Sequence, residues 1–109
     1  MQPIYEVVSG QILLSRRREF FRLHSEILLP IMKDIGIKPK MLLITEIGRY
    51  GKFTDIYQYQ DLMQYRLLTD KLLADPRVEP YYAEVGQCIH GSIMVEIMVD
   101  LPYAREWRS

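Results

Sequence analysis

MLLITEIGRYGKFTDIYQY, residues 41–59, is the segment from which the fold follows. Two apolar stretches with period-2 alternation flank Gly48-Arg49-Tyr50-Gly51, and glycine supplies the positive φ that a tight strand reversal needs. The segment therefore predicts a β-hairpin at the centre of a sheet. It also carries an acid, a base and several tyrosines near one bend, which makes it a candidate ligand-binding segment.

Periodicity predicts further strands and helices on both sides of the hairpin. In chain order they are a strand at 4–8, a helix at 15–36, the hairpin, a helix from Asp61, a short helix at 75–86 and a strand at 93–99. Ser15 and Asp61 are the expected N-caps, and Asp75 is expected to cap the short helix. Pro30 removes a backbone donor, so we expect a bend near Leu29. The helix after Asp61 has an apolar face made of Leu62, Tyr65, Leu68 and Leu72.

The order β-α-β-β-α-β predicts an α+β fold of the ferredoxin-like type, a single domain at 1–109 with its helices on one face of the sheet. MLLITEI and SIMVEIMV are apolar on both alternating sets, so the other face also needs cover. A second copy is the simplest cover, and it predicts a homodimer that closes into a dimeric α+β barrel. Trp107 is expected to pack on the domain or on its partner.

Composition excludes several classes of protein. Lys+Arg and Asp+Glu both total 14, so no excess charge draws the protein to nucleic acid or to a membrane surface. Cys88 is the only cysteine, which excludes an intrachain disulfide and a cysteine-built zinc site and predicts a cytoplasmic protein. The first residues lack the basic start and long apolar run of a signal peptide, so we expect none. The sequence has no apolar run of membrane-spanning length and no phosphate-binding or metalloprotease motif. We expect no metal and no cofactor.

His24 is the first candidate catalytic residue. It falls in the middle of the apolar arc of the first predicted helix, between the directions of Ile31 and Ile35, and so is expected to point at the sheet. An imidazole there is suited to acid-base work, or to binding a metal or haem. The alternative is a core histidine bonded to a strand side chain or a backbone carbonyl.

Three acids lie among apolar strand residues: Glu6, Asp55 and Glu96. The predicted order places the strand of Glu6 between the other two, so the three carboxylates approach one another if they share a face. Burial raises the pKa of an unpaired carboxylate, which is how acid-base sites are built, and Asp55 joins His24 as a candidate catalytic residue. The alternative is that each acid pairs with an arginine, lysine or tyrosine and holds the register of the dimer.

Residues of the hairpin are candidate ligand contacts. Tyr57 and Tyr59 are suited to orienting a small aromatic or carbonyl compound, and Arg49 to neutralising an anionic group. The full set of predicted ligand-binding residues is Glu6, Glu46, Arg49, Tyr57, Tyr59 and Glu96. The alternative is that the hairpin residues only suit a strand surface and a solvated turn.

The succession of short motifs resembles the NIPSNAP family, within the dimeric α+β barrel superfamily. These motifs are IYE at 4–6, Pro30 and Gly36, EIG at 46–48, YQYQDL at 57–62 and LLADP at 72–76. Two positions depart from the family pattern: Gly51 stands where asparagine is usual, and Val78 where tryptophan is usual. The resemblance implies an unassigned activity, among relatives that include cofactor-independent monooxygenases, haem-degrading enzymes, isomerases and cyclases, with ligands held between sheet and helices.

Three functions stay open. The first is a cofactor-independent enzyme of the oxygenase, isomerase or cyclase type, which acts on a small hydrophobic metabolite and predicts an enclosed cleft against His24. The second is a noncatalytic dimeric module that binds a ligand or a protein and surrounds a pocket with tyrosines but no proton-transfer pair. The third is a haem-binding protein, in which a planar group of that size must reach His24.

Overall fold

Four antiparallel strands form one sheet in the computed structural model, which describes residues 2–108. β1 (Ile4–Ile12) pairs with both β3 (Lys52–Tyr59) and β4 (Ile89–Val99), and β2 (Lys38–Ile44) pairs with β3. The order across the sheet is therefore β2-β3-β1-β4. This is the ferredoxin-like order predicted from the sequence, with β1 between β3 and β4, and the predicted fold class is confirmed.

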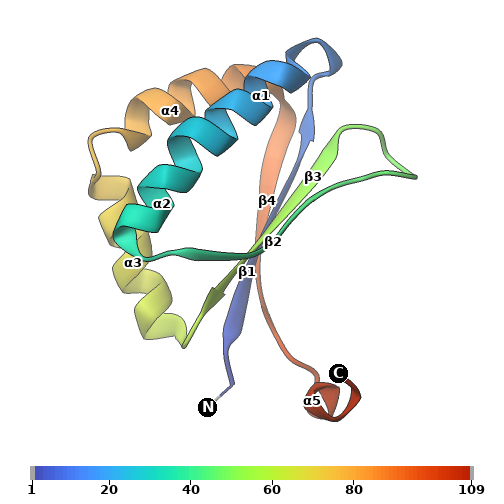
Figure 1. Ribbon diagram of the computed structural model, residues 1–109, viewed down its shortest axis with the longest axis vertical. Helices are drawn as coiled ribbons and strands as arrows, with labels where there is room; N and C mark the ends of the chain where they lie inside the picture. The colour runs from blue at the N-terminus through green and yellow to red at the C-terminus, as the bar shows by residue number, and fades with distance from the viewer. Residues whose placement is uncertain (1, 109) are drawn as a thin grey trace.

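The main helices lie together on one face of the sheet, as predicted (Figure 1). A 3-10 turn η1, α1, a π-helical turn η2 and α2 follow one another without a break, and α3 and α4 come between β3 and β4. Their bounds, with those of the turn η3 and the last helix, are η1 Leu14–Arg16, α1 Arg17–Leu23, η2 His24–Leu28, α2 Leu29–Ile35, α3 Leu62–Ala74, α4 Val78–Val85, η3 Gly86–Cys88 and α5 Ala104–Trp107.

The irregular turn η2 explains how Pro30 is accommodated. Proline has no N–H to donate to the preceding helical turn, and the backbone N–H of Leu29 instead reaches back five residues to the carbonyl of His24. The bend expected near Leu29 thus takes the form of a π turn that ends at Leu28. Such turns are frequent at functional sites because the extra residue redirects a side chain.

Alternation along β3 separates the two faces of the sheet. Phe53, Asp55, Tyr57 and Tyr59 are buried under the helices, whereas the residues between them are less buried. Glu6 of β1 is the register partner of Tyr57, so its side chain lies on the same face. The helix-facing layer of the sheet therefore contains two carboxylates and two phenols within an apolar core.

The opposite face of the sheet is apolar and uncovered. It carries Met41 and Leu43 of β2 and Met94 and Met98 of β4, each between 44% and 59% exposed. Isolated apolar residues at a surface are ordinary, but several on one sheet face mark an interaction surface. The prediction that the sheet is apolar on both sides is therefore met by the outer strands β2 and β4 in part only, because Ser9, Thr54 and Glu96 also lie on this face.

The hairpin is wider than the predicted tight reversal. β2 ends at Ile44 and β3 begins at Lys52, so a loop at 45–51 joins them. Gly48 and Gly51 do take positive φ, of 133° and 81°, as the turn chemistry requires. Ile47 was assigned to a strand by its apolar neighbours, but it lies at the loop tip and is 94% exposed.

Helix starts agree with the prediction in one case of three. Asp61 caps α3, because its carboxylate accepts a hydrogen bond from the backbone N–H of Gln64 at 2.8 Å. Ser15 makes no such bond, and α1 begins only at Arg17. Asp75 instead accepts from the backbone N–H of Arg77 at 2.9 Å, which stabilises a turn and delays α4 to Val78. Leu62 was predicted on the buried face of α3 but is exposed.

The C-terminal segment stands apart from the body of the fold (Figure 1). Trp107 in α5 is 82% exposed, so the prediction that it packs on its own domain is wrong, and packing on a partner stays a prediction. Among the described residues, no helix combines the length and the apolar character that crossing a membrane requires.

Candidate functional site

His24 and Asp55 form a hydrogen-bonded pair between helix and sheet. His24 Nε2 lies 2.6 Å from Oδ2 of Asp55, whose side chain projects from β3 and is 4% exposed. His24 directly follows α1 and points at the sheet, and Phe20, one helical turn earlier, stacks on its ring with centroids 5.4 Å apart and planes inclined by 17°. The imidazole is thus held at one end by a carboxylate and on one face by an aromatic ring.

Tyr57 completes a chain of three side chains. Its hydroxyl donates to the same Oδ2 of Asp55 at 3.0 Å. Burial first, and then the adjacent Asp55 carboxylate, raise the pKa of Tyr57 far above its ordinary value, so the phenol remains a donor at any physiological pH. Asp55 therefore accepts from both of its neighbours.

The geometry assigns the two nitrogens of His24 different roles. Because Nε2 faces a carboxylate oxygen, it carries the proton of the neutral ring. Nδ1 is then the unprotonated nitrogen, and no hydrogen bond within residues 2–108 uses it. A histidine oriented by a carboxylate in this way is arranged to accept a proton at its other nitrogen.

Glu6 forms a second polar cluster on the same face of the sheet. Its two carboxylate oxygens accept from the hydroxyls of Tyr59 at 3.4 Å and Tyr65 at 3.2 Å. Burial raises the pKa of Glu6, and the bonds from Tyr65 and Tyr59 lower it by less, so the net direction is upward. Burial and the nearby Glu6 also raise the pKa of Tyr59. The cluster is therefore built around a carboxyl whose pKa lies above its ordinary value.

A cavity of about 180 Å³ joins the two clusters between the sheet and the helices. Its polar lining includes Glu6, His24, Asp55, Tyr57 and Tyr59, and most of the remaining wall is apolar. A concave, largely apolar space with a few converging polar groups is the usual form of a small-molecule site. A cleft lies against His24, but it is not the enclosed one that the enzyme hypothesis expects, because Leu73, Ile93 and Val95 in its wall are 45–61% exposed.

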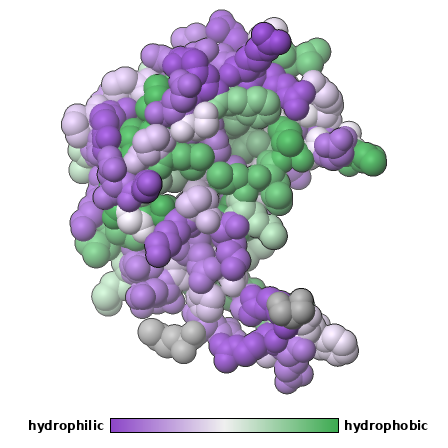
Figure 2. Space-filling view, viewed as in Figure 1, coloured by the Kyte–Doolittle hydropathy of each residue, from purple (hydrophilic) through white to green (hydrophobic). Residues whose placement is uncertain are grey.

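A groove of about 360 Å³ lies on the other side of the same histidine. It runs between α1 and β2, where Phe21, Leu29 and Leu42 line it, and it shares His24 and Asp55 with the cavity. Figure 2 shows apolar side chains gathered in this region, between the first helix and the hairpin. The His24–Asp55 pair is therefore a partition between an inner cavity and an outer groove.

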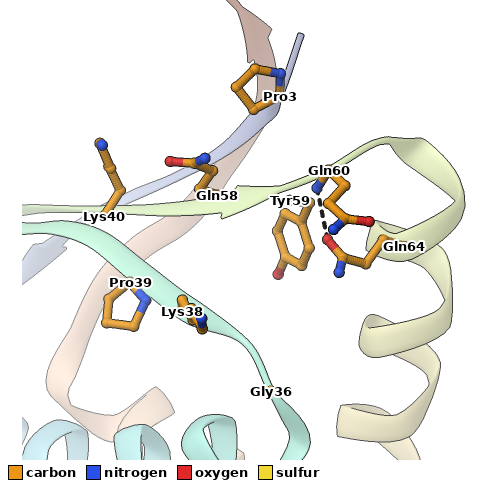
Figure 3. A pocket seen from close by; sticks show the side chains of 9 residues that line it. All are labelled: Pro3, Gly36, Lys38, Pro39, Lys40, Gln58, Tyr59, Gln60 and Gln64. Atoms are coloured by element: carbon orange, nitrogen blue, oxygen red, sulfur yellow. Dashed lines mark hydrogen bonds between the residues drawn. The ribbon is translucent and has the colours of Figure 1, made fainter. Parts of the chain in front are cut away.

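A hollow of about 740 Å³ at another end of the sheet has no such chemistry (Figure 3). Lys38 and Lys40 of β2 line it together with glutamines, one of which, Gln64, accepts from the backbone N–H of Gln60 at 2.7 Å. The lining contains no carboxylate and no histidine, and the hollow is open to solvent. It offers no acid-base pair.

The predicted site residues divide into two groups. His24, Asp55, Glu6, Tyr57 and Tyr59 line one cavity. The structure does not bring the other three to it. Glu46 and Arg49 are exposed in the hairpin loop, and Glu96 lies on the open face of the sheet, where its register partner is Val7.

Three further residues belong to this site, and the sequence did not assign them to it. Tyr65 bonds Glu6, Phe20 stacks on His24, and Tyr82 of α4 lines the cavity. Tyr65 and Phe20 were placed on apolar helix faces, which is the signal that could have found them. Among residues 2–108, no group of three or more His, Cys, Asp or Glu side chains is arranged to hold a metal ion.

Known structures share this architecture. No protein-family model and no curated protein matches the sequence. A NIPSNAP family protein from Agrobacterium tumefaciens, however, superposes with a TM-score of 0.84 at 20% sequence identity, covering 94% of this chain and 96% of that one. An uncharacterised NIPSNAP domain protein from Burkholderia xenovorans gives 0.82 at 14% identity, over 92% and 96% of the two chains. The chain has the NIPSNAP fold.

The NIPSNAP fold extends to more distant proteins. A Nitrosomonas europaea protein proposed as an antibiotic biosynthesis monooxygenase matches with a TM-score of 0.71 at 9% identity, over 93% of this chain and 92% of that one. The family resemblance stated from the sequence is confirmed at the level of the fold. Because a shared fold hosts many activities, function has to be argued from the cavity itself.

Proposed function

We propose that the protein is a cofactor-independent enzyme that acts on a small hydrophobic metabolite in the cavity between sheet and helices. One observation supports this above the others: His24 and Asp55 meet at 2.6 Å in the wall of a mostly apolar cavity. His24 is the general base, Asp55 holds its tautomer and orientation, and Tyr57 holds Asp55. A base so placed can remove a proton from an acidic C–H bond of the substrate, which is one way in which isomerase, cyclase and cofactor-independent oxygenase reactions begin.

The same pair weighs against the noncatalytic alternative. A binding module predicts tyrosines around a pocket without a proton-transfer pair. Here the tyrosines are accompanied by a histidine whose Nδ1 is left open and whose Nε2 is fixed by a carboxylate. Positioned acid-base groups in a cleft are more frequent in enzymes than in binding modules.

The size of the cavity weighs against haem. An engineered apolar cavity of about 150 Å³ holds one benzene ring, and the cavity beside His24 measures about 180 Å³. A tetrapyrrole macrocycle is several times larger than one ring. Binding haem through His24 would also require breaking its bond with Asp55.

We also propose that the protein works as a cytoplasmic homodimer. The apolar face formed by Met41, Leu43, Met94 and Met98 is exposed in the single chain, and a second copy would cover it. Cys88 is a free, buried thiol, which suits a reducing compartment. Trp107 is free to pack on the second copy.

Comparative metabolite profiling tests the enzymatic proposal. A small-molecule extract of the source cells is incubated with wild-type protein, with His24→Ala and with His90→Ala, and compounds that disappear are followed by mass spectrometry. His90 is the matched control because it is the other histidine and is exposed. We expect one or a few compounds to be consumed by wild type and by His90→Ala but not by His24→Ala. Equal consumption by folded His24→Ala would contradict the proposal.

A further inference from the structure

Two separate proton-carrying groups, Glu6 and the His24–Asp55 pair, line the cavity. Glu6 is directly opposite Tyr57 in the register of β1 and β3, and Asp55 lies two positions further along β3 on the same face. Diagonal neighbours of this kind are about 7–8 Å apart between backbones, which is the span of one small ring with its contacts. Glu6 and the His24–Asp55 pair thus line the same cavity from neighbouring positions of the sheet.

The surroundings of Glu6 are uncharged on every element packed against it. β3 contributes Tyr57 and Tyr59, α3 contributes Tyr65 and α4 contributes Tyr82, while the register partner on β4 is Ile97. No lysine or arginine forms an ion pair with Glu6 within residues 2–108, and none lines the cavity. Only the hydroxyls of Tyr59 and Tyr65 stabilise the charged form of Glu6, and burial outweighs them, so the pKa of Glu6 is raised and its neutral form is available as a hydrogen-bond donor.

The cavity also limits the ligand. Its volume of about 180 Å³ exceeds by little the space that holds one benzene ring. Its walls are mostly apolar and its fixed ionisable groups are acids and one histidine, so an anionic ligand would meet repulsion without a compensating cation. The ligand that fits is uncharged, about one ring in size, and carries one polar group.

We infer that the substrate is a one-ring, uncharged carbonyl compound with an acidic C–H bond, and that Glu6 is the acid that hydrogen-bonds and protonates its carbonyl oxygen. This inference rests on the proposed role of His24 as base. It selects the isomerase among the three enzyme types, and it assigns a catalytic role to a carboxyl that otherwise only anchors two tyrosines.

The step balances within the cavity. Nδ1 of His24 takes the proton from the carbon next to the carbonyl group, and the C–H electron pair becomes the carbon–carbon double bond of an enol. The carbonyl π electrons move to oxygen, which receives the proton of Glu6. His24 then returns a proton to the same carbon, or to a conjugated carbon further along, while the enol O–H gives its proton back to the Glu6 carboxylate, which re-forms the carbonyl group and restores both residues. No oxidant, metal or cofactor is consumed.

A purely structural role for Glu6 is the competing explanation. As an anchor, Glu6 accepts from Tyr59 and Tyr65 and holds α3 on the sheet. Glu6→Gln preserves the shape and an accepting oxygen but has no carboxylic proton to transfer. If Glu6 is only an anchor, Glu6→Gln should therefore keep its activity, whereas if Glu6 is the acid, the variant should lose it.

Solvent exchange at carbon tests the inference directly. Phenylacetone and 2-cyclohexenone are incubated in buffered D₂O with wild type, Glu6→Gln, His24→Ala and Glu96→Gln, and the loss of α-proton signals is followed by NMR. Glu96→Gln is the matched control, because Glu96 lies on the opposite face of the sheet. We expect exchange above the buffer rate with wild type and Glu96→Gln, and a decrease of about 100-fold or more in Glu6→Gln and His24→Ala.

Two results separate this inference from the proposed function. Exchange that is lost in His24→Ala but unchanged in Glu6→Gln overturns the role of Glu6 and leaves the base in place. If neither ketone exchanges its α-protons faster with wild type than in buffer alone, the inferred substrate class is wrong. The proposed function is tested separately, by whether wild type consumes a metabolite.

Infrared spectroscopy provides a readout that does not depend on activity or on the right ketone. The difference spectrum between wild type and Glu6→Gln at pH 7 is expected to contain the carbonyl stretch of a protonated carboxylic acid. The difference spectrum between wild type and Glu96→Gln is the control and is expected to lack this band. If Glu6→Gln fails to fold, ligand-induced shifts of this band in wild type replace the comparison. A carboxylate band for Glu6 at pH 7, without the acid band, overturns the inference.

Discussion

His24 and Asp55 lie 31 positions apart in the chain, and their side chains meet at 2.6 Å where the first helix crosses the sheet. His24 directly follows helix α1, and the buried face of β3 carries Asp55. The contact uses Nε2 and leaves Nδ1 without a hydrogen bond among the described residues, in the wall of a mostly apolar cavity. The proposed function follows from this arrangement.

Asp55→Asn is expected to lower turnover without unfolding the protein. The amide has nearly the same shape, but it no longer fixes the proton on Nε2 of His24, so the ring loses its productive tautomer. We expect kcat for the consumed metabolite to fall by about 100-fold or more while KM changes little. Asp70→Asn, at an exposed position of α3, is the control and is expected to match wild type. Equal kcat values for the two variants would rule out the orienting role.

Tyr57→Phe is expected to lower stability. The variant removes a buried hydroxyl that donates to Asp55 at 3.0 Å, and hydrogen bonds to charged groups contribute about 1.5–3 kcal/mol. Urea unfolding is expected to show a decrease of about that size in the free energy of unfolding. Tyr103→Phe, at an exposed position, is expected to change it by less than about 0.5 kcal/mol. Similar free energies of unfolding for the two variants would show that the hydrogen bond of Tyr57 does not stabilise the fold.

The raised pKa of Glu6 makes a prediction about pH. Because burial raises the pKa of the folded-state carboxyl above its ordinary value, the folded chain holds this proton more tightly than the unfolded chain does. The resulting stabilisation is complete below the unfolded pKa and is lost as pH rises through the folded pKa. The stability of wild type relative to Glu6→Gln is therefore expected to decline from acidic toward neutral pH in denaturant midpoints. A difference that grows with pH would mean that the pKa of Glu6 is lowered instead.

The open face of the sheet predicts the behaviour of a single-charge variant. Met94→Lys places an ammonium group where the second copy is proposed to pack, and burying an unpaired charge is costly. Sedimentation velocity is expected to show a dimer for wild type and a dissociation constant raised at least about tenfold for the variant. Leu67→Lys, on an exposed position of α3 away from that face, is the control and should remain dimeric. A stable wild-type monomer would overturn the proposed assembly.

Sequence periodicity was sufficient for the strand order and for the direction of His24. An apolar arc at helical spacing shows which way a side chain points, and this placed His24 toward the sheet. It could not show which strand residue the ring would meet, because that depends on the register of β3 under the helix. Asp55 was identified only as an acid among apolar neighbours.

Register also decides which acids share a face. Glu6 and Asp55 lie on the helix side because Glu6 is opposite Tyr57, whereas Glu96 is opposite Val7 and lies on the other side. A shift of one residue between strands would exchange these faces, and alternation alone does not fix it. Three carboxylates that looked equivalent in the sequence thus divide into two cavity residues and one residue of the open face.

The hairpin loop differs from what the local sequence pattern predicted. Apolar neighbours of Ile47 predicted that the strand continues to Gly48, but β2 ends at Ile44, and the loop carries Glu46 and Arg49 away from the cavity. Trp107 was expected to be packed, yet nothing within its own chain covers it among the described residues. In both places an apolar side chain, Ile47 or Trp107, is exposed to solvent in the single chain. This is expected of a surface that a partner covers.

The protonation of His24 is the most direct test of the central claim. In a His90→Gln protein labelled with ¹⁵N-histidine, His24 is the only histidine, and its two ring nitrogens can be assigned without ambiguity by NMR. At the pH where the enzyme works, the account predicts a proton on Nε2 and none on Nδ1. A proton on Nδ1 at that pH would contradict the role of His24 as base.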